Sequence, residues 1–485
     1  MTTCRFIFLL LCYVLTTTVD ASPEDQKTEE WCSPAVNVTK ENITINCNGI
    51  SPKVITQLER LIVQKNADLV GAKTEIDYWL KKYNELITDL TKRPATDKLA
   101  AKARELLAEG ELNATEALLK ESFSQKLKEQ DQFSEVAARN AYDLGSIKEL
   151  QLAYREALDY YEKAISIQAD NALYLNEIGL LHFRLAHYKQ AIEYLEPALA
   201  GNLKSYGEDH PKVATTRNNL GLAWHSLGEF HKAINYYELA LASDLKTYGE
   251  NYPNVASIRN NLGSAWFSLG KFHKAIEYYE QALTQGIKTH GENHPDVAIT
   301  RNNLASAWNS LKEHRKAIEY YELALASELK SYGENHPNVA STRNNLGSVW
   351  NSLGEHRKAI EYYEIALASN LKTYGENHPS VARNRNNLGL AWNSLDEHHK
   401  AIEYFELALA SDLKTYGENH PSVATRRNNL GLVWYSLGEY YKAIEYYELA
   451  LSTLEKSLGK NHPNTIKTLR NLDTARTALH EPFRD

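Results

Sequence analysis

Residues 210–251 read HPKVATTRNNLGLAWHSLGEFHKAINYYELALASDLKTYGEN, and the rest of the chain is organised around copies of this stretch. Each copy has a proline as its second residue, and these prolines stand 42 residues apart, at positions 211, 253, 295, 337, 379, 421 and 463. A fixed period between about 20 and 50 residues is typical of a stacked repeat architecture. The sequence therefore predicts one supersecondary unit repeated along the chain, rather than a single enlarged core.

Each unit contains two amphipathic segments with the period of a helix. Apolar residues recur at helical spacing in the first segment at Val213, Leu220, Trp224 and Leu227, and in the second at Ala233, Tyr237, Ala240, Leu241, Leu245 and Tyr248. Pro211 stands where the first turn of a helix tolerates a missing N–H, and Gly228 and Gly249 follow the two segments as helix-ending residues. We therefore expect a helical hairpin whose apolar faces are buried by stacking on its neighbours.

This unit resembles a tetratricopeptide repeat in Leu220-Gly221, the aromatic Trp224, Gly228 with Phe230, and then Ala233, Tyr237 and Ala240. The 42-residue form, with its Asn-Asn-Leu and Gly-Glu-Asn-His-Pro segments, is similar to the repeats of kinesin light chains and related bacterial and fungal proteins. The resemblance covers about residues 138–480. It implies an all-α fold, a right-handed α-α superhelix whose first helices line a concave groove, and a function in protein–protein interaction.

The chain outside the 42-residue copies divides into further segments. Residues 94–137 are expected to form a degenerate helical pair that caps the array, because stacked repeats need atypical terminal units. The complete predicted order is a signal peptide (1–21), a Cys-containing segment (22–50), a coiled-coil-like helix (51–93), the capping pair (94–137), about eight tetratricopeptide repeats (138–465), and a C-terminal capping helix and tail (466–485).

The N-terminus has the pattern of a signal peptide. Arg5 precedes the ten apolar residues from Phe6 to Leu15, which are too few to span a bilayer, and Ala21 offers a cleavage site. We therefore expect a secreted or periplasmic protein without a membrane span after signal removal. The net charge of −8 argues against nucleic acid as a partner, because a phosphate-binding surface needs clustered Lys and Arg.

Removal of the signal peptide would leave Cys32 and Cys47 as the remaining cysteines. In an exported chain this pair suggests one disulfide that closes a short loop, and two free thiols are the alternative. Asn37, Asn42 and Asn113 each begin an Asn-x-Thr sequon, which would be a glycosylation acceptor in a eukaryotic host.

A heptad-like pattern precedes the repeats. Its seam, at alternating steps of three and four, consists of Ile55, Leu58, Ile62, Lys65, Leu69, Ala72, Ile76, Trp79, Tyr83, Leu86 and Leu90. Such a seam predicts a coiled coil about 50 Å long, through which the chain would form a homodimer. Kinesin light chains also place heptads ahead of their repeats. The alternative is a long helix that folds back on the first repeats.

The sequence offers no catalytic motif. It lacks a Gly-x-Ser-x-Gly elbow, a His-Glu-x-x-His pair, a Cys-x-x-Cys pair and a dinucleotide-binding glycine fingerprint. The histidines at 210, 294, 336, 378, 420 and 462 recur once in each unit, so stacking should separate them in the loops before the first helices. An active site needs different groups meeting at one place, whereas repetition makes repeated patches. We therefore expect no enzyme activity, no metal and no cofactor.

The candidate binding residues are paired asparagines in the first helix of each unit, namely Asn218 and Asn219, Asn260 and Asn261, Asn302 and Asn303, Asn344 and Asn345, Asn386 and Asn387, and Asn428 and Asn429. An amide carries donors and acceptors, so it can pair with the backbone of an extended peptide whatever its side chains. The resemblance implies this role for the second Asn of each pair. The alternative is that one Asn of each pair ties neighbouring repeats together.

Two other sets accompany these asparagines. An arginine precedes each pair, at 217, 259, 301, 343, 385 and 427, and would contact either acidic groups of a ligand or glutamates of adjacent units. The units vary most at His225, Phe267, Asn309, Asn351, Asn393 and Tyr435, where Phe267 and Tyr435 are candidate anchors for a partner.

These features predict a non-catalytic scaffold that binds peptide segments or partner proteins along its concave face. A structural spacer without a specific groove ligand and a regulatory subunit of an exported enzyme complex are the alternatives.

Overall fold

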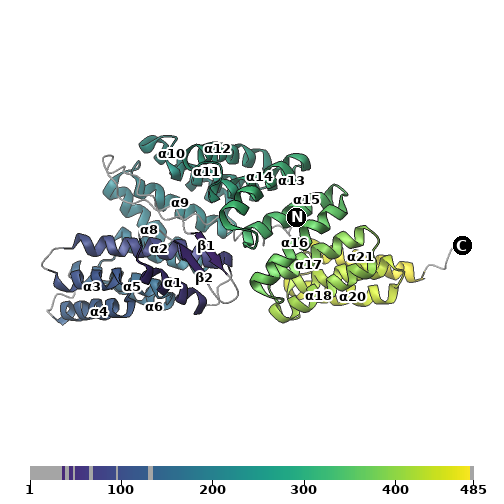
Figure 1. The fold of residues 1–485 in the computed structure, drawn as a ribbon, viewed down its shortest axis with the longest axis horizontal. Coiled ribbons are helices and arrows are strands. Elements are labelled where there is room, and N and C mark those ends of the chain that lie inside the picture. Colours follow the sequence, from purple (N-terminus) through teal and green to yellow (C-terminus); the bar gives the residue numbers. More distant parts are fainter. Residues whose placement is uncertain are drawn as a thin grey trace. The chain divides into compact units, whose positions relative to one another are not determined.

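The computed structural model describes residues 35–38, 43–46, 50–64, 69–93, 97–128 and 135–480 (Figure 1). These residues form two compact units, which divide between Ala307 and Trp308. The predicted signal peptide (1–21) and the residues Cys32, Cys47 and Asn42 lie outside the described residues. Export and the disulfide therefore stay predictions.

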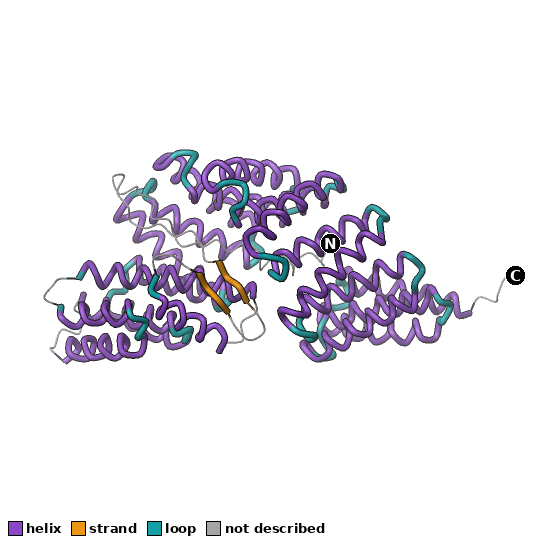
Figure 2. Tube along the Cα trace, viewed as in Figure 1, coloured by secondary structure: helices purple, strands orange, loops and turns teal. Residues whose placement is uncertain are grey.

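The N-terminal unit begins with two short strands, drawn in orange in Figure 2. Strands β1 (Ala35–Val38) and β2 (Ile43–Asn46) pair antiparallel, and Val36 lies opposite Ile45. No strand was predicted here, although both segments are rich in the β-branched residues that favour strands. The candidate glycosylation residue Asn37 lies in β1, opposite Thr44.

The remaining elements of this unit are helices packed in consecutive pairs. They are α1 (Pro52–Gln64), α2 (Leu69–Lys92), α3 (Lys98–Ala108), α4 (Leu112–Lys128), α5 (Glu135–Leu150), α6 (Tyr154–Ile167), α7 (Ala172–Arg184), α8 (Tyr188–Tyr206), α9 (Pro211–Ser226), α10 (Phe230–Tyr248), α11 (Pro253–Ser268), α12 (Phe272–His290) and α13 (Pro295–Ser310), whose last residues belong to the second unit.

The C-terminal unit continues the same alternation of a 16-residue first helix and a 19-residue second helix. It contains α14 (His314–Tyr332), α15 (Pro337–Ser352), α16 (His356–Tyr374), α17 (Pro379–Ser394), α18 (His398–Tyr416), α19 (Pro421–Ser436), α20 (Tyr440–Leu458) and α21 (Pro463–His480). The predicted all-α repeat fold is confirmed, with the β1–β2 hairpin as an addition. Of the described helices, none is both long enough and apolar enough to cross a membrane.

The recurring histidines cap the first helices. In α17, the Nδ1 atom of His378 accepts a hydrogen bond from the backbone N–H of Ser380 at 3.1 Å, and the imidazole stacks on Tyr374 with ring centroids 3.9 Å apart. The same capping bond recurs at His210, His294, His336, His420 and His462, at 3.1 to 3.2 Å. The imidazole thus supplies the acceptor that Ser, Asp or Asn usually supplies at this position.

Glycine allows the two helices of each hairpin to approach closely. A Cβ atom built on Gly347 of α15 would lie 2.7 Å from Cε1 of Tyr363 in α16, well inside van der Waals contact. Equivalent glycines that face an aromatic ring are Gly145, Gly221, Gly263, Gly389 and Gly431. The turn between the helices needs a left-handed residue, which is Gly354 in one unit but Lys312 and Asp396 in two others.

The segment predicted as a coiled coil is two helices, α1 and α2, and its seam faces the chain's own core. The seam residues with described side chains are Ile55, Leu58, Ile76, Trp79, Tyr83, Leu86 and Leu90, and all are buried in one cluster with residues of α3, α4 and α5. Lys65 lies outside the described residues. The coiled-coil prediction is not confirmed, because side chains buried inside the chain are not available to a second copy.

Polar pairs join successive repeats, each between a second helix and the next first helix, 14 residues further on. The distances between donor and acceptor atoms are 3.0 Å for Asn202–Thr216, 2.8 Å for Glu328–Thr342, 2.6 Å for Asn370–Asn384 and 3.0 Å for Asp412–Arg426. The junction of α10 and α11 differs, because Ile258 stands where the partner of Asp244 would be. The buried Oδ1 atom of Asp244 has no hydrogen-bond partner, and burial raises the pKa of this carboxyl to about 7.

Candidate binding face

The first helices of successive repeats lie next to one another within each unit. In the N-terminal unit these are α7, α9 and α11, and in the C-terminal unit α15, α17, α19 and α21. We use the name first-helix face for the surface of these helices, and of the corresponding helix α5, that carries the paired asparagines or the residues at equivalent positions.

The asparagines on the first-helix face form hydrogen bonds from one repeat to the next. Nδ2 of Asn261 donates to Oδ1 of Asn218 at 3.1 Å, and Nδ2 of Asn429 donates to Oδ1 of Asn386 at 2.8 Å. The same bond joins Asn219 to Asn176 at 3.4 Å, Asn303 to Asn260 at 3.1 Å, Asn387 to Asn344 at 2.9 Å and Asn471 to Asn428 at 3.1 Å. Partners are 43 residues apart, so the first Asn of one unit accepts from the second Asn of the next.

The side-chain amides of the second asparagines are less exposed to solvent in the N-terminal unit than in the C-terminal unit. In the N-terminal unit the second asparagines are buried, with 2% of Asn219, 4% of Asn261 and 3% of Asn303 exposed. In the C-terminal unit Asn345, Asn387 and Asn429 are half-buried. Asn302 donates from Nδ2 to the carbonyl of Ala298 within its own helix at 3.3 Å. Any ligand that uses these amides would therefore reach them more readily in the C-terminal unit.

The arginines beside the asparagines hold the loop that precedes each first helix. Nη1 of Arg217 donates to the carbonyl of Glu208 at 3.2 Å and to Oγ of Ser243 at 2.9 Å. The equivalent loop carbonyl accepts from Arg301, Arg343 and Arg385, and a loop glutamate carboxylate pairs with Arg259 and Arg427. All six arginines are buried. Their contacts match the alternative in which they pair with glutamates of adjacent units.

The variable positions face the hairpin turn and pair with the residue five positions later. The ring of Phe267 lies 5.2 Å from that of Phe272, and the ring of Tyr435 lies 5.4 Å from that of Tyr440. Where the position is Asn, its Oδ1 contacts Nδ1 of a histidine, as in Asn309–His314, Asn351–His356 and Asn393–His398, at 2.7 to 2.9 Å. Phe267 is only 9% exposed. The joint variation of the two positions was a visible signal in the repeats, and it indicates packing of the turn.

Helix α2 is seated on the first-helix face of the first two repeats. Nζ of Lys82 forms an ion pair with Glu177 of α7 and lies 3.5 Å from Glu149 of α5, and Nε1 of Trp79 donates to the carbonyl of Leu150 at 2.7 Å. Burial alone would lower the pKa of Lys82, but the carboxylates of Glu149 and Glu177 outweigh it and raise that pKa.

The residues that hold α2 stand at positions that carry asparagine in later repeats. Glu177 precedes Asn219 by one 42-residue period, and Asp143, which pairs with Arg93 at the end of α2, precedes Glu177 by 34 residues. The first-helix face therefore receives a segment of this chain through the same row of positions that the sequence analysis selected. Lys82 and Arg93 were not predicted, and Trp79 was predicted only as a seam residue, because heptad spacing alone does not distinguish packing within the chain from packing between chains.

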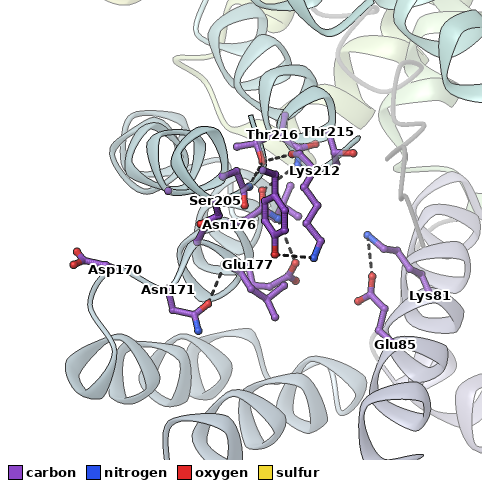
Figure 3. Close-up of a pocket in the computed structure, with 17 residues that line it drawn as sticks. Lys81, Glu85, Asp170, Asn171, Asn176, Glu177, Ser205, Lys212, Thr215 and Thr216 are labelled. Carbon is purple, nitrogen blue, oxygen red and sulfur yellow. Dashed lines mark hydrogen bonds and ion pairs between the residues drawn. The ribbon is translucent and has the colours of Figure 1, made fainter. Parts of the chain in front are cut away.

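A polar cavity of about 370 Å³ lies beside α2, between it and helices α7, α8 and α9 (Figure 3). Lys81 and Glu85 of α2, whose charged groups are 3.3 Å apart, line one side. Asn176, Lys212 and Asn219 line the other, and the buried Oδ1 atom of Asn219 has no hydrogen-bond partner. Among the candidate residues, Asn219 is thus brought into a cavity with residues distant in sequence.

Two further predictions concern metal binding and glycosylation. Within the described ranges, no group of three or more His, Cys, Asp or Glu side chains could hold a metal ion. Asn113, the third candidate glycosylation residue, is exposed near the start of α4, and its Oδ1 accepts from Nε2 of Gln151 at 3.2 Å. Thr115 of the same sequon is buried.

Comparison with solved structures found several similar chains. The "putative kinesin light chain nearly identical TPR-like repeats" of Podosopora anserina is 24% identical, with 43% of this chain and 98% of that chain covered and a TM-score of 0.39. BtubC from P. vanneervenii is 25% identical, with coverage of 49% and 92% and a TM-score of 0.41. The apo form of RapI is 17% identical, with coverage of 62% and 99% and a TM-score of 0.47. A search of curated proteins found no match.

Family models place the repeats within the sequence directly. One tetratricopeptide repeat model matches residues 169–246, 225–285, 254–327, 309–369 and 338–414, and a second matches residues 423–464. The first model alone spans more than half of the chain. This repeat fold generally serves as a non-catalytic scaffold for interactions between proteins. The chain belongs to the tetratricopeptide repeat family.

Proposed function

We propose that the protein is a non-catalytic scaffold that binds polypeptide segments of a partner protein along its first-helix face. The observation that carries the proposal is the seat of α2 on α5 and α7. There, one segment of chain is held by an indole N–H on a main-chain carbonyl and by a lysine between two carboxylates, Glu149 and Glu177. These are the kinds of contact through which a groove holds a helix or an extended segment.

The later repeats of the C-terminal unit repeat this face with accessible residues. Asn387 and Asn429 are half-buried, and Leu432, three residues after Asn429 and therefore on the same side of α19, is 38% exposed. An amide row beside an exposed leucine offers hydrogen bonds to a main chain and apolar contact to its side chains. We therefore assign the binding of a partner to α15, α17 and α19.

The proposal is tested by capturing partners from the exported fraction and identifying them by mass spectrometry. Leu432→Arg places a charge on the first-helix face, whereas Leu407→Arg places the same charge on the second helix α18, where Leu407 is 42% exposed. We expect Leu432→Arg to lose the partners of the wild type and Leu407→Arg to retain them. Equal capture by both variants would show that this face is not the binding surface. Absence of any stoichiometric partner of the wild type would favour the structural spacer.

Export of the protein is part of the same proposal and rests on the apolar segment Phe6–Leu15 and the cleavage site after Ala21. Sequencing of the N-terminus of protein recovered outside the cytoplasm should give Ser22 as the first residue. An intact Met1 would contradict the proposal.

A further inference from the structure

Two arginines break the repetition of the first-helix face. Arg383 of α17 stands at a position that carries Thr215, Ser257, Ile299, Ser341 and Thr425 in other units. Arg426 of α19 stands at a position that carries Thr216, Ile258, Thr300, Thr342 and Asn384. The helix α21 also has a charged residue, Lys467, at the first of these positions and Thr468 at the second. Since the other units from α9 to α19 have uncharged residues at both positions, neither arginine is needed to build the repeat. Both lie in the C-terminal unit, where the amides of the face are more accessible.

The offset between these arginines places them side by side. Arg426 follows Arg383 by 43 residues, which is also the offset of the bonds between the paired asparagines of successive repeats, such as Asn429–Asn386 at 2.8 Å. Arg383 precedes Asn386 and Asn387 by three and four residues, so it lies on the same side of α17 as that pair. The two arginines therefore stand beside the amide row of the first-helix face, and the guanidinium group of Arg426 pairs with Asp412 of α18.

The charges at this place are not balanced within the described part of the chain. Nε of Arg426 pairs with Oδ2 of Asp412 at 3.0 Å, and Asp412 is buried. Arg383 has no hydrogen bond or ion pair there, and its Nε atom is buried. Burial lowers the pKa of Arg383; the nearby Tyr374 acts to raise it, and the neighbouring charge of Arg426 acts to lower it. The carboxylate of Asp412 thus pairs with one of two neighbouring guanidinium groups. A half-buried cation that is left without a partner is costly.

We propose that Arg383, with Arg426 beside it, binds the carboxylate of an acidic side chain in a polypeptide segment that lies along the first-helix face. A guanidinium group presents two parallel N–H donors that match the two oxygens of a carboxylate. The added negative charge would balance the site, and Asn387 and Leu390, half-buried on the same helix, flank it for contact with the segment. This assignment rests on the proposed function and adds the chemical class of the segment to it.

The proposal is tested with a library of random peptides displayed on phage and selected on the full-length protein. Arg383→Thr restores the residue of the next unit, Thr425, and Arg357→Thr removes the same charge from an exposed position of α16. We expect peptides selected by the wild type and by Arg357→Thr to share an Asp or Glu at one position. Peptides selected by Arg383→Thr should lack it. A selected peptide should bind the wild type about tenfold more tightly than its Glu→Gln or Asp→Asn version, and Arg383→Thr should not discriminate.

The outcomes separate this inference from the proposed function. Peptides selected without an acidic position, or equal discrimination by Arg383→Thr and the wild type, would overturn the carboxylate site while the face remains a binding surface. Failure of the wild type to select any peptide would overturn both proposals. Displacement of the acidic peptide by inorganic phosphate, but not by chloride at equal ionic strength, would assign the site to a phosphate group instead. Arg383→Thr should also melt at a temperature no lower than the wild type, and a much lower melting temperature would mean that Arg383 is structural.

Discussion

Replacing Asp244 by Asn should stabilise the protein at alkaline pH and leave it nearly unchanged at acidic pH. Asp244 is 2% exposed, its Oδ1 atom has no hydrogen-bond partner, and the residue 14 positions later is Ile258 instead of a polar partner. Burial disfavours the charged carboxylate, and the pKa of Asp244 is therefore raised to about 7. Asn keeps the shape of the side chain and removes the charge.

The magnitude follows from the difference between the folded and unfolded pKa values. A rise of the pKa from its ordinary value of 3.8 to about 7 corresponds to about 4 kcal/mol of destabilisation once the group is ionised in both states. The pKa of Asp244 is higher in the folded protein than in the unfolded chain. Below the pKa of the unfolded chain, Asp244 is protonated in both states, and its contribution to stability is fully present. That contribution is lost as the pH rises through about 7. The advantage of Asp244→Asn over the wild type should therefore grow from near zero at about pH 4 to its maximum above about pH 8.

The assay is urea unfolding followed by far-ultraviolet circular dichroism at several pH values. Asp412→Asn is the matched control, because Asp412 occupies the equivalent position but pairs with Arg426 at 3.0 Å. That substitution should destabilise the protein by about 3 kcal/mol, since it leaves a buried guanidinium group unpaired. Parallel pH profiles for Asp244→Asn and the wild type would refute the reasoning, as would stabilisation by both substitutions.

Three further changes test the geometry of the repeat by thermal unfolding. Gly347→Ala should destabilise the protein by about 1–3 kcal/mol, because its Cβ would lie 2.7 Å from the ring of Tyr363; an unchanged melting temperature would mean that the helices separate freely. Lys312→Gly should stabilise it by about 1 kcal/mol, because Lys312 has a φ of 64°; a lower melting temperature would contradict this. His378→Ala should cost about 1 kcal/mol through loss of the helix cap, whereas His378→Asn should preserve it; equal losses would refute the capping role.

The sequence predicted the helices well because each is marked by chemistry that acts locally. Pro379 and Gly375 lie where the period places a helix start and a helix end, and the structure has α17 beginning at Pro379 and α16 ending before Gly375. The role of His378 as a cap could not be predicted in the same way, because it depends on the orientation of the imidazole. A histidine in a loop is compatible with many roles until its Nδ1 atom is seen to accept from Ser380.

Packing between distant segments was harder to predict. The seam through Trp79 and Leu86 has the same spacing whether it meets a second chain or the chain's own helices, and only its burial with residues of α3, α4 and α5 distinguishes the two. The bonds between asparagines were also ambiguous. The period of 42 residues suggests contact between equivalent residues, whereas the bond from Asn429 to Asn386 spans 43 residues, one step further along the neighbouring helix.

Near-identical repeats make the exceptions informative, and Asp244 and Arg383 are exceptions of the same kind. Asp244 is buried without the polar partner that equivalent residues in other repeats have. Arg383 is half-buried at a position where most other repeats have an uncharged residue that needs no ionic partner. Their surroundings differ. Asp244 is closed off from solvent at a junction between helices, so a proton is the species that neutralises it, and its effect should appear as a dependence of stability on pH. Arg383 is half-buried on the first-helix face, where the guanidinium group stays charged and part of the side chain is open to a ligand. An unpaired charged side chain therefore makes stability depend on pH where solvent is excluded, as at Asp244. On the first-helix face, as at Arg383, it favours a ligand of opposite charge.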